Sequence, residues 1–94
     1  MTKEEEQTEV YKVKRGGIVR NVYDAVVVTL KPKQILEMNG AEGYGVFRVG
    51  RCNVKLSYVP TRKRIEITGS PEERRRTRTL IEKMADVTLK IRRD

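Results

Sequence analysis

The sequence predicts an α+β fold with two layers: an antiparallel or mixed β-sheet of four to six strands packed against a capped helix over 71–85, followed by a final strand. Two observations lead to this prediction. Several short segments alternate apolar and polar residues, which is typical of strands with one buried face, and a helix start signal follows one of these segments. The length of 94 residues suits a single domain with a small core.

The helix over 71–85 has the clearest local signal. Ser70 is placed as its N-cap, Pro71 takes the first helical position, and Glu73 is placed to complete a capping box. The apolar residues of its second half share one stripe at helical spacing: Leu80, Ile81, Met84 and Ala85. Its first half carries arginines that we expect to lie in solvent, partly in i,i+4 pairs with glutamates: Arg74, Arg75, Arg76 and Arg78.

The N-terminal third is less regular. Residues 1–9 are acidic and lack apolar periodicity, so we expect a disordered lead before a single domain over 10–94. Strand composition over 10–15, followed by Gly16–Gly17, indicates a strand and a hairpin-type turn. Residues 18–30 have apolar positions that suit a helix, but their run of valines prefers a strand, and we favour a strand for the second half.

The rest of the chain consists mainly of predicted strands. Pro32 begins a short segment in which we expect one or two helical turns ending at Asn39–Gly40. Alternating residues then predict four strands: 44–51, 54–58, 64–68 and 87–91. We expect the helix to cover the isoleucine face of the sheet. The opposite face should be mostly basic, and it should carry these residues: Arg48, Lys55, Ser57, Arg64, Glu66, Lys90 and Arg92.

The charge is large and unevenly distributed. The whole chain has a formal net charge of +8, but four glutamates and one lysine give the first ten residues −3, which leaves +11 on the other 84. Such a surplus attracts polyanions, so nucleic acid is the first class of partner to expect. A high charged fraction is also common on thermophile-like surfaces.

Composition also excludes several classes of function. The chain has no histidine and a single cysteine, Cys52, which excludes a histidine-based triad or a zinc site within one chain. No carboxylates are paired at a useful spacing, so we expect no enzyme, cofactor or metal. No apolar run approaches ~18 residues and the N-terminus is acidic, so we expect a cytoplasmic protein without a membrane partner.

One loop has a form known from nucleic-acid binding. Gly40–Gly43 is a GxxG segment, in which two glycines let main-chain N–H groups approach phosphates. Together with the pattern Ile65–Gly69 before the helix, it resembles a KH domain, an RNA and single-stranded DNA binding module, over residues 25–85. In that family the GxxG loop joins two helices and usually carries a basic residue, where this chain has Ala41 and Glu42.

Two other families of small basic proteins are similar to parts of the chain. Residues 14–27 and 87–94 are similar to the Alba family, and residues 46–92 are similar to small ribosomal proteins. All three resemblances imply binding to nucleic acid, by analogy of fold.

We therefore expect a non-enzymatic protein that binds RNA or single-stranded DNA mainly through phosphates, with low sequence selectivity. Arg62–Arg64 are the first choice for phosphate contacts, and Tyr44 is the best-placed ring for stacking on a base. The predicted contact residues are Lys31, Lys33, Gly40, Gly43, Tyr44, Arg48, Lys55, Arg62, Lys63 and Arg64. The alternative is a protein-interaction or assembly subunit, which would form a homo-oligomer or dock in a ribonucleoprotein or other complex.

Overall fold

Two helices, one short 3-10 turn and five strands make up the part of the chain that the structure describes. A computed structural model describes residues 7–12, 16–39, 43–59 and 62–89. The elements, in chain order, are β1 (Gln7–Lys12), α1 (Gly16–Thr29), η2 (Pro32–Gln34), β2 (Ile35–Asn39), β3 (Tyr44–Val49), β4 (Cys52–Val59), β5 (Arg62–Gly69) and α2 (Pro71–Ala85). The predicted α+β fold, with a sheet packed against a C-terminal helix, is confirmed.

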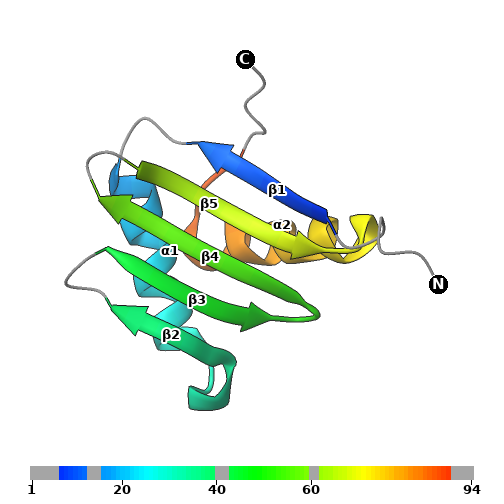
Figure 1. Ribbon diagram of the computed structural model, residues 1–94, viewed down its shortest axis with the longest axis horizontal. Helices are drawn as coiled ribbons and strands as arrows, with labels where there is room; N and C mark the ends of the chain where they lie inside the picture. Colours follow the sequence, from blue (N-terminus) through cyan, green and yellow to red (C-terminus); the bar gives the residue numbers. More distant parts are fainter. Residues whose placement is uncertain (1–6, 13–15, 40–42, 60–61, 90–94) are drawn as a thin grey trace.

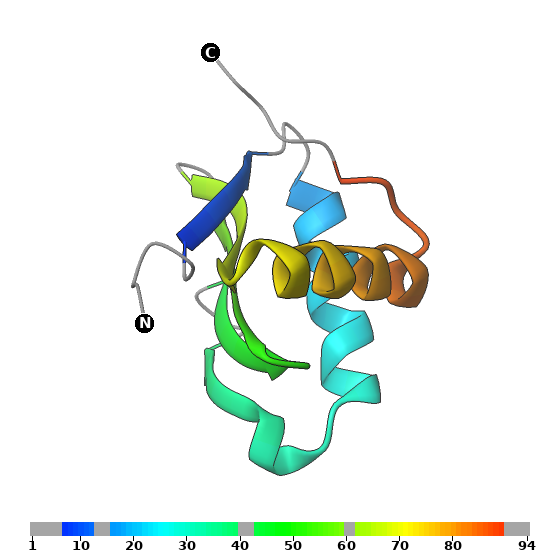
Figure 2. The same cartoon turned by 90° about the vertical axis from the view of Figure 1, so that its right-hand side faces the viewer.

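The strands form one antiparallel sheet in the order β1-β5-β4-β3-β2. β2 to β5 follow one another along the chain as a meander, and β1 pairs with the outer side of β5 (Figure 1). Both helices pack against the same face of the sheet (Figure 2). The molecule is therefore a two-layer structure whose second sheet face is covered by neither helix.

The core lies between the sheet and the helices. The sheet contributes fully buried side chains from its three central strands, and Ile65 and Ile67 are among them, as predicted for the isoleucine face. The ring of Phe47 meets the ring of Tyr23 from α1 edge to face, with centroids 5.7 Å apart. α2 contributes Ile81, which is fully buried. Alternation along the strands therefore determines which face the helices cover.

α1 corrects the interpretation of the N-terminal third. Residues 16–29 form one helix, so the turn at Gly16–Gly17 and the strand in the second half of 18–30 are wrong. The buried residues of α1 recur every three or four positions: Val19, Val22, Tyr23 and Val26. A valine costs a helix only about 0.5 kcal/mol in propensity, whereas burying its side chain contributes roughly 1.5–3 kcal/mol. The burial of Val19, Val22 and Val26 therefore outweighs the strand preference of the valines in α1.

Three other segments differ in kind from the prediction. β1 begins at Gln7, so the last part of the expected disordered lead over 1–9 is paired with β5. The expected helical turns after Pro32 are limited to η2, because the next five residues form β2 at the edge of the sheet. Residues 87–89 are not a strand, and the rest of the expected strand over 87–91 lies outside the described residues, as do Lys90 and Arg92.

The end of α2 explains why the chain does not continue directly as a strand. Asp86 adopts a left-handed conformation with φ of 56°, and the N–H of Val87 bonds to the carbonyl of Glu82. The N–H of Leu89 then donates to the carboxylate of Glu82 at 2.8 Å, and the Leu89 side chain is buried. These contacts fold the chain back against its own helix.

The N-cap Ser70 and Pro71 at the start of α2 agree with the sequence prediction, but the buried face of the helix differs from it. The Oγ of Ser70 accepts a hydrogen bond from the N–H of Glu73, with Pro71 at the start of the helix. Arg74, which was expected in solvent, is buried, and Leu80, which was expected in the core, is 45% exposed. Arg74 lies on the same stripe as Thr77 and Ile81, at i, i+3 and i+7, so helical spacing could have identified it.

Candidate nucleic-acid interface

The uncovered face of the sheet carries the polar residues of the strands. Across β3, β4 and β5, Tyr44 lies opposite Ser57, which lies opposite Arg64. In the adjacent row, Lys55 lies opposite Glu66. The predicted polar face, including Glu66, is thus confirmed where it is described, but it is less basic than expected because Glu37 of β2 also lies on it.

Tyr44 is the aromatic side chain at the centre of this candidate interface. It begins β3, and the Nζ of Lys55 lies 5.6 Å from the centre of its ring. Its hydroxyl lies 3.4 Å from a carboxylate oxygen of Glu37, to which it donates. Desolvation and then the Glu37 carboxylate raise the pKa of Tyr44 above its ordinary value. The ring is therefore neutral at physiological pH and does not repel a phosphate.

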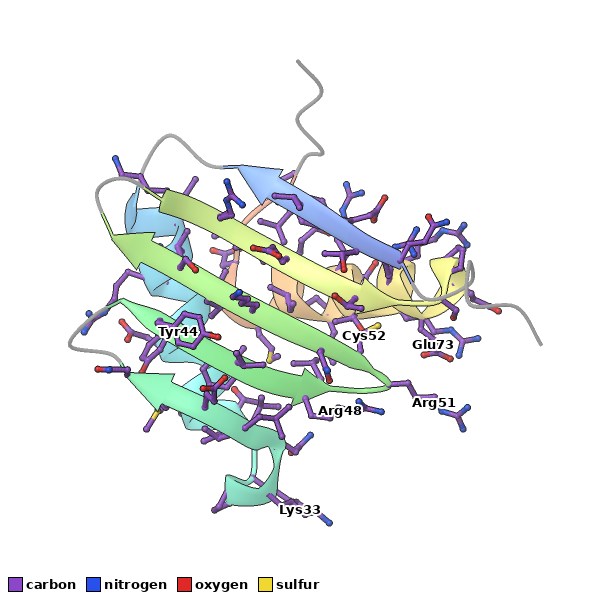
Figure 3. The ribbon with its side chains drawn as sticks, in the orientation of Figure 1. Lys33, Tyr44, Arg48, Arg51, Cys52 and Glu73 are labelled. Carbon is purple, nitrogen blue, oxygen red and sulfur yellow. The ribbon has the colours of Figure 1, made fainter. Side chains whose placement is uncertain are left out.

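Exposed cations gather at the end of the face where β3 turns into β4. Figure 3 shows Lys33 of η2, Arg48 of β3 and Arg51 of the turn projecting from this end, and we call these three residues the turn-end cluster. The side chain of Gln34 donates to the carbonyl of Arg48 at 3.3 Å, which holds η2 against β3. Lys31 immediately precedes η2 and is exposed as well.

The turn-end cluster is free of ion pairs to the carboxylates that the structure describes. The guanidinium of Arg48 donates to the side-chain oxygen of Asn53 at 2.9 Å, which orients it across β3 and β4 without neutralising it. Arg51 was not among the predicted contact residues. Its position directly after Gly50 could have indicated an exposed side chain at a turn, since Gly50 has a φ of 62° in the hairpin between β3 and β4.

The predicted Arg62–Arg64 group does not form one surface. All three residues belong to β5, so successive side chains point to opposite faces of the sheet. Arg64 lies on the uncovered face, where its Nη1 is 4.0 Å from a carboxylate oxygen of Glu66. Lys63 lies on the helix-covered side, like Ile65. The side chain of Arg62 lies outside the described residues. Arg62–Arg64 therefore lie within a strand, because β5 begins two residues before the predicted strand over 64–68.

The glycine loop connects two strands. β2 precedes it and β3 follows it, whereas a KH domain would have a helix on each side. Gly43 has a φ of 69° directly before β3, a conformation that glycine adopts without strain. Gly40 lies outside the described residues, together with the two residues between the glycines. The described part of the loop therefore has a structural role, which is to turn the chain into β3.

Most arginines of α2 are neutralised locally. The predicted i,i+4 ion pairs are present. The Nη2 of Arg76 lies 3.2 Å from a carboxylate oxygen of Glu72, and the Nε of Arg78 lies 3.6 Å from one of Glu82. Arg74 lies 3.5 Å from Glu9 of β1. These pairs reduce the positive charge that the helix layer presents to a polyanion, in contrast to the turn-end cluster.

Comparisons with known proteins add no identification. No protein-family model matches the chain, and neither the curated proteins nor the solved structures contain a significant match. Within the described residues, no three acidic or cysteine side chains form a group that could hold a metal ion. In the same part of the chain, neither helix is long and apolar enough to cross a membrane.

Proposed function

We propose that the protein binds single-stranded nucleic acid, RNA or DNA, without acting as an enzyme, and that the strand lies across the uncovered face of the sheet. The observation that carries this proposal is that Arg48 shares a sheet face with Tyr44 and Lys55, with Arg51 and Lys33 exposed at the same end of the sheet. Cations without local counter-charges can replace the counterions of a phosphate backbone. A strand running along β3 would meet the cluster at one end and the Tyr44 ring at the other.

The ring favours a single strand as the ligand. A base stacks on an aromatic side chain only when it is free from its neighbours in a duplex. Guanidinium and ammonium contacts to phosphates carry no base information, so we expect low sequence selectivity. Lys31 and Arg64 extend the positive surface on either side of this path. The charge of Arg64 is partly neutralised by the Glu66 carboxylate, which lies 4.0 Å from its guanidinium.

The decisive experiment measures affinity for a single-stranded oligonucleotide against salt concentration. Each phosphate neutralised on a single strand contributes about 0.7 to the slope of log K against log salt. Replacing Arg48 and Arg51 by Gln should therefore reduce the slope by about 1.4. The control replaces Arg76 and Lys83 on α2, which removes the same charge from the helix layer and should leave the slope unchanged. A flat salt dependence, or equal losses in both variants, would contradict the proposal.

An assembly role is the second candidate, and the outer strand β2 favours it. β2 lies at the edge of the sheet, and two of its apolar side chains are about half exposed: Leu36 at 50% and Met38 at 53%. An unpaired strand edge can accept a strand from another chain. Size-exclusion chromatography with light scattering, in high salt and after nuclease treatment, tests this role. A stable oligomer that Met38→Lys dissociates would favour it over the first candidate, and a monomer would exclude self-association through β2 under those conditions.

A further inference from the structure

A hollow of about 240 Å³ lies between β1 and the first half of α2, on the helix-covered side of the sheet. Its lining consists of Glu9, Pro71, Arg74, Arg75 and Arg78. We call it the arginine hollow. Three of its five residues are cationic and one is anionic, so it has a positive balance that the proposed nucleic-acid interface does not use.

Arg74 is held rigidly within this hollow. Its side chain is 9% exposed, and its Nη1 donates to the carbonyls of Gly69 at 2.8 Å and Gln7 at 3.3 Å. Its Nε is buried without a hydrogen-bond acceptor. The nearest carboxylate oxygen, on Glu9, is 3.5 Å away, which is close enough for an ion pair but does not satisfy the N–H. A buried charged donor without a hydrogen-bond acceptor is costly, so the positive charge of Arg74 is only partly compensated at the base of the hollow.

Glu9 is only a partial counter-ion for Arg74. The same oxygen of Glu9 accepts a hydrogen bond from the hydroxyl of Tyr11 at 2.9 Å, so two donors share it. The guanidinium of Arg78 lies 5.7 Å from the centre of the Tyr11 ring and also pairs with Glu82. Arg75 is exposed and has no ion pair with a described residue. The hollow therefore retains unneutralised positive charge.

We propose that the arginine hollow binds a phosphate group, with Arg75 and Arg78 as direct ligands and Arg74 as the buried cation behind them. A guanidinium fork matches the oxygens of a phosphate, and the doubly charged group balances the surplus better than a carboxylate does. The first turn of α2, which Pro71 begins, adds the positive end of the helix dipole. The incoming phosphate competes with Glu9 for the arginines.

The test is thermal unfolding of the full chain in increasing inorganic phosphate, with ionic strength held constant by sodium chloride. Binding to the folded state should give a saturable rise in Tm. Arg75→Gln should lose at least half of that rise, because it removes an exposed ligand whose side chain has no structural partner. Arg76→Gln is the matched control, since it removes the same charge from the next residue of α2, which does not line the hollow. Equal losses in the two variants, or no saturable rise in the wild type, would overturn the proposal.

Glu9→Gln tests the competition. It keeps a side chain of the same shape but removes the internal anion, so phosphate should bind more tightly and raise Tm further than in the wild type. An equal or smaller rise would overturn the proposal.

The source of the phosphate is distinguished with one oligonucleotide prepared with a 5′-phosphate and with a 5′-hydroxyl. Tighter binding of the phosphorylated form, lost in Arg75→Gln, assigns the hollow to the end of a nucleic acid. Equal binding of both forms, together with the saturable effect of inorganic phosphate, assigns it to a free phosphate compound. The oligonucleotide still binds in Arg75→Gln if the sheet-face proposal is correct, so failure of one proposal does not imply failure of the other.

Discussion

The Nζ of Lys55 lies 5.6 Å from the centre of the Tyr44 ring, on the sheet face that neither helix covers. A cation over a partly exposed ring stabilises the pair by about 0.5–1 kcal/mol. The contact keeps the only described aromatic ring of this face beside a positive charge. A base and the phosphate next to it can therefore be bound by neighbouring side chains on adjacent strands.

The first prediction concerns stacking on this ring. Tyr44→Leu should weaken binding of a single-stranded oligonucleotide by about 1–3 kcal/mol, because it removes the aromatic surface for one base. Tyr44→Phe should bind almost as well as the wild type, since the hydroxyl contacts only Glu37 at 3.4 Å. Fluorescence anisotropy at fixed salt measures both affinities. If Tyr44→Phe loses as much as Tyr44→Leu, stacking is not the cause.

The second prediction concerns two glycines. A Cβ on Gly45 would lie 2.7 Å from the ring of Phe47 and 3.1 Å from Tyr23, inside the buried core. Overpacking of this kind costs about 1–3 kcal/mol, more than the 0.4–1 kcal/mol or so gained from restricting the unfolded chain. Gly45→Ala should therefore lower the free energy of unfolding in urea.

Gly17→Ala is the matched control. A Cβ on Gly17 meets nothing within 4 Å, and the residue lies in the first turn of α1. Alanine is favoured over glycine in a helix by up to about 1 kcal/mol, so this variant should be at least as stable as the wild type. If Gly45→Ala and Gly17→Ala lower the free energy of unfolding equally, overpacking against Phe47 is not the cause of the loss in Gly45→Ala.

The third prediction concerns alkaline pH. Desolvation and the neighbouring Glu9 raise the pKa of Tyr11 to about 12 from an ordinary value of 10.0. The folded state therefore keeps this proton after the unfolded state has lost it. Stability from this group is fully present below pH 10 and is lost as the pH rises from 10 towards 12, by up to roughly 2–3 kcal/mol.

Tyr11→Phe removes the titrating group without emptying its buried site. The free energy of unfolding of Tyr11→Phe should fall less steeply above pH 10 than that of the wild type. All other ionisable groups are the same in both proteins, so the difference between the two curves comes from Tyr11. Urea unfolding at a series of pH values gives the two curves. Parallel curves over this range would contradict the assignment to Tyr11.

The fourth prediction concerns the start of α2. Ser70→Ala removes the oxygen that accepts from the N–H of Glu73, and should destabilise the protein by about 0.5–1 kcal/mol, the lower part of the usual range for an N-cap, because the bond is 3.4 Å long. Thr79→Ala is the control, since this exposed hydroxyl only bonds back to the carbonyl of Arg75 at 3.1 Å within the same helix. In urea unfolding, Thr79→Ala should leave the free energy of unfolding unchanged or raise it. A larger loss of stability in Thr79→Ala than in Ser70→Ala would contradict the role of the cap.

Sequence reasoning identified part of the candidate interface and misplaced another part. Arg48, Lys55 and Arg64 were correctly assigned to one face, because alternation along a strand is a local property. Lys63 was grouped with Arg62 and Arg64 as a phosphate contact. Because Lys63 already belongs to β5, its side chain points to the helix-covered side of the sheet, opposite to that of Arg64. Arg51 was missed as a contact residue because it lies in the turn between β3 and β4, where alternation along a strand does not assign a side chain to a face.

The sequence by itself determined the features that depend on neighbours along the chain. The strands β3 and β5 follow from alternation, α2 follows from Ser70 and Pro71, and the net positive charge follows from the surplus of lysine and arginine. Only the tertiary structure decided the features that depend on distant contacts. It made α1 a helix, because burial of its valines against the sheet outweighs their strand preference, and it buried Arg74, because the carbonyls of Gln7 and Gly69 meet there. Local propensities differ by less than a kilocalorie per residue, whereas the burial of a single side chain contributes more, so packing decides wherever the two conflict.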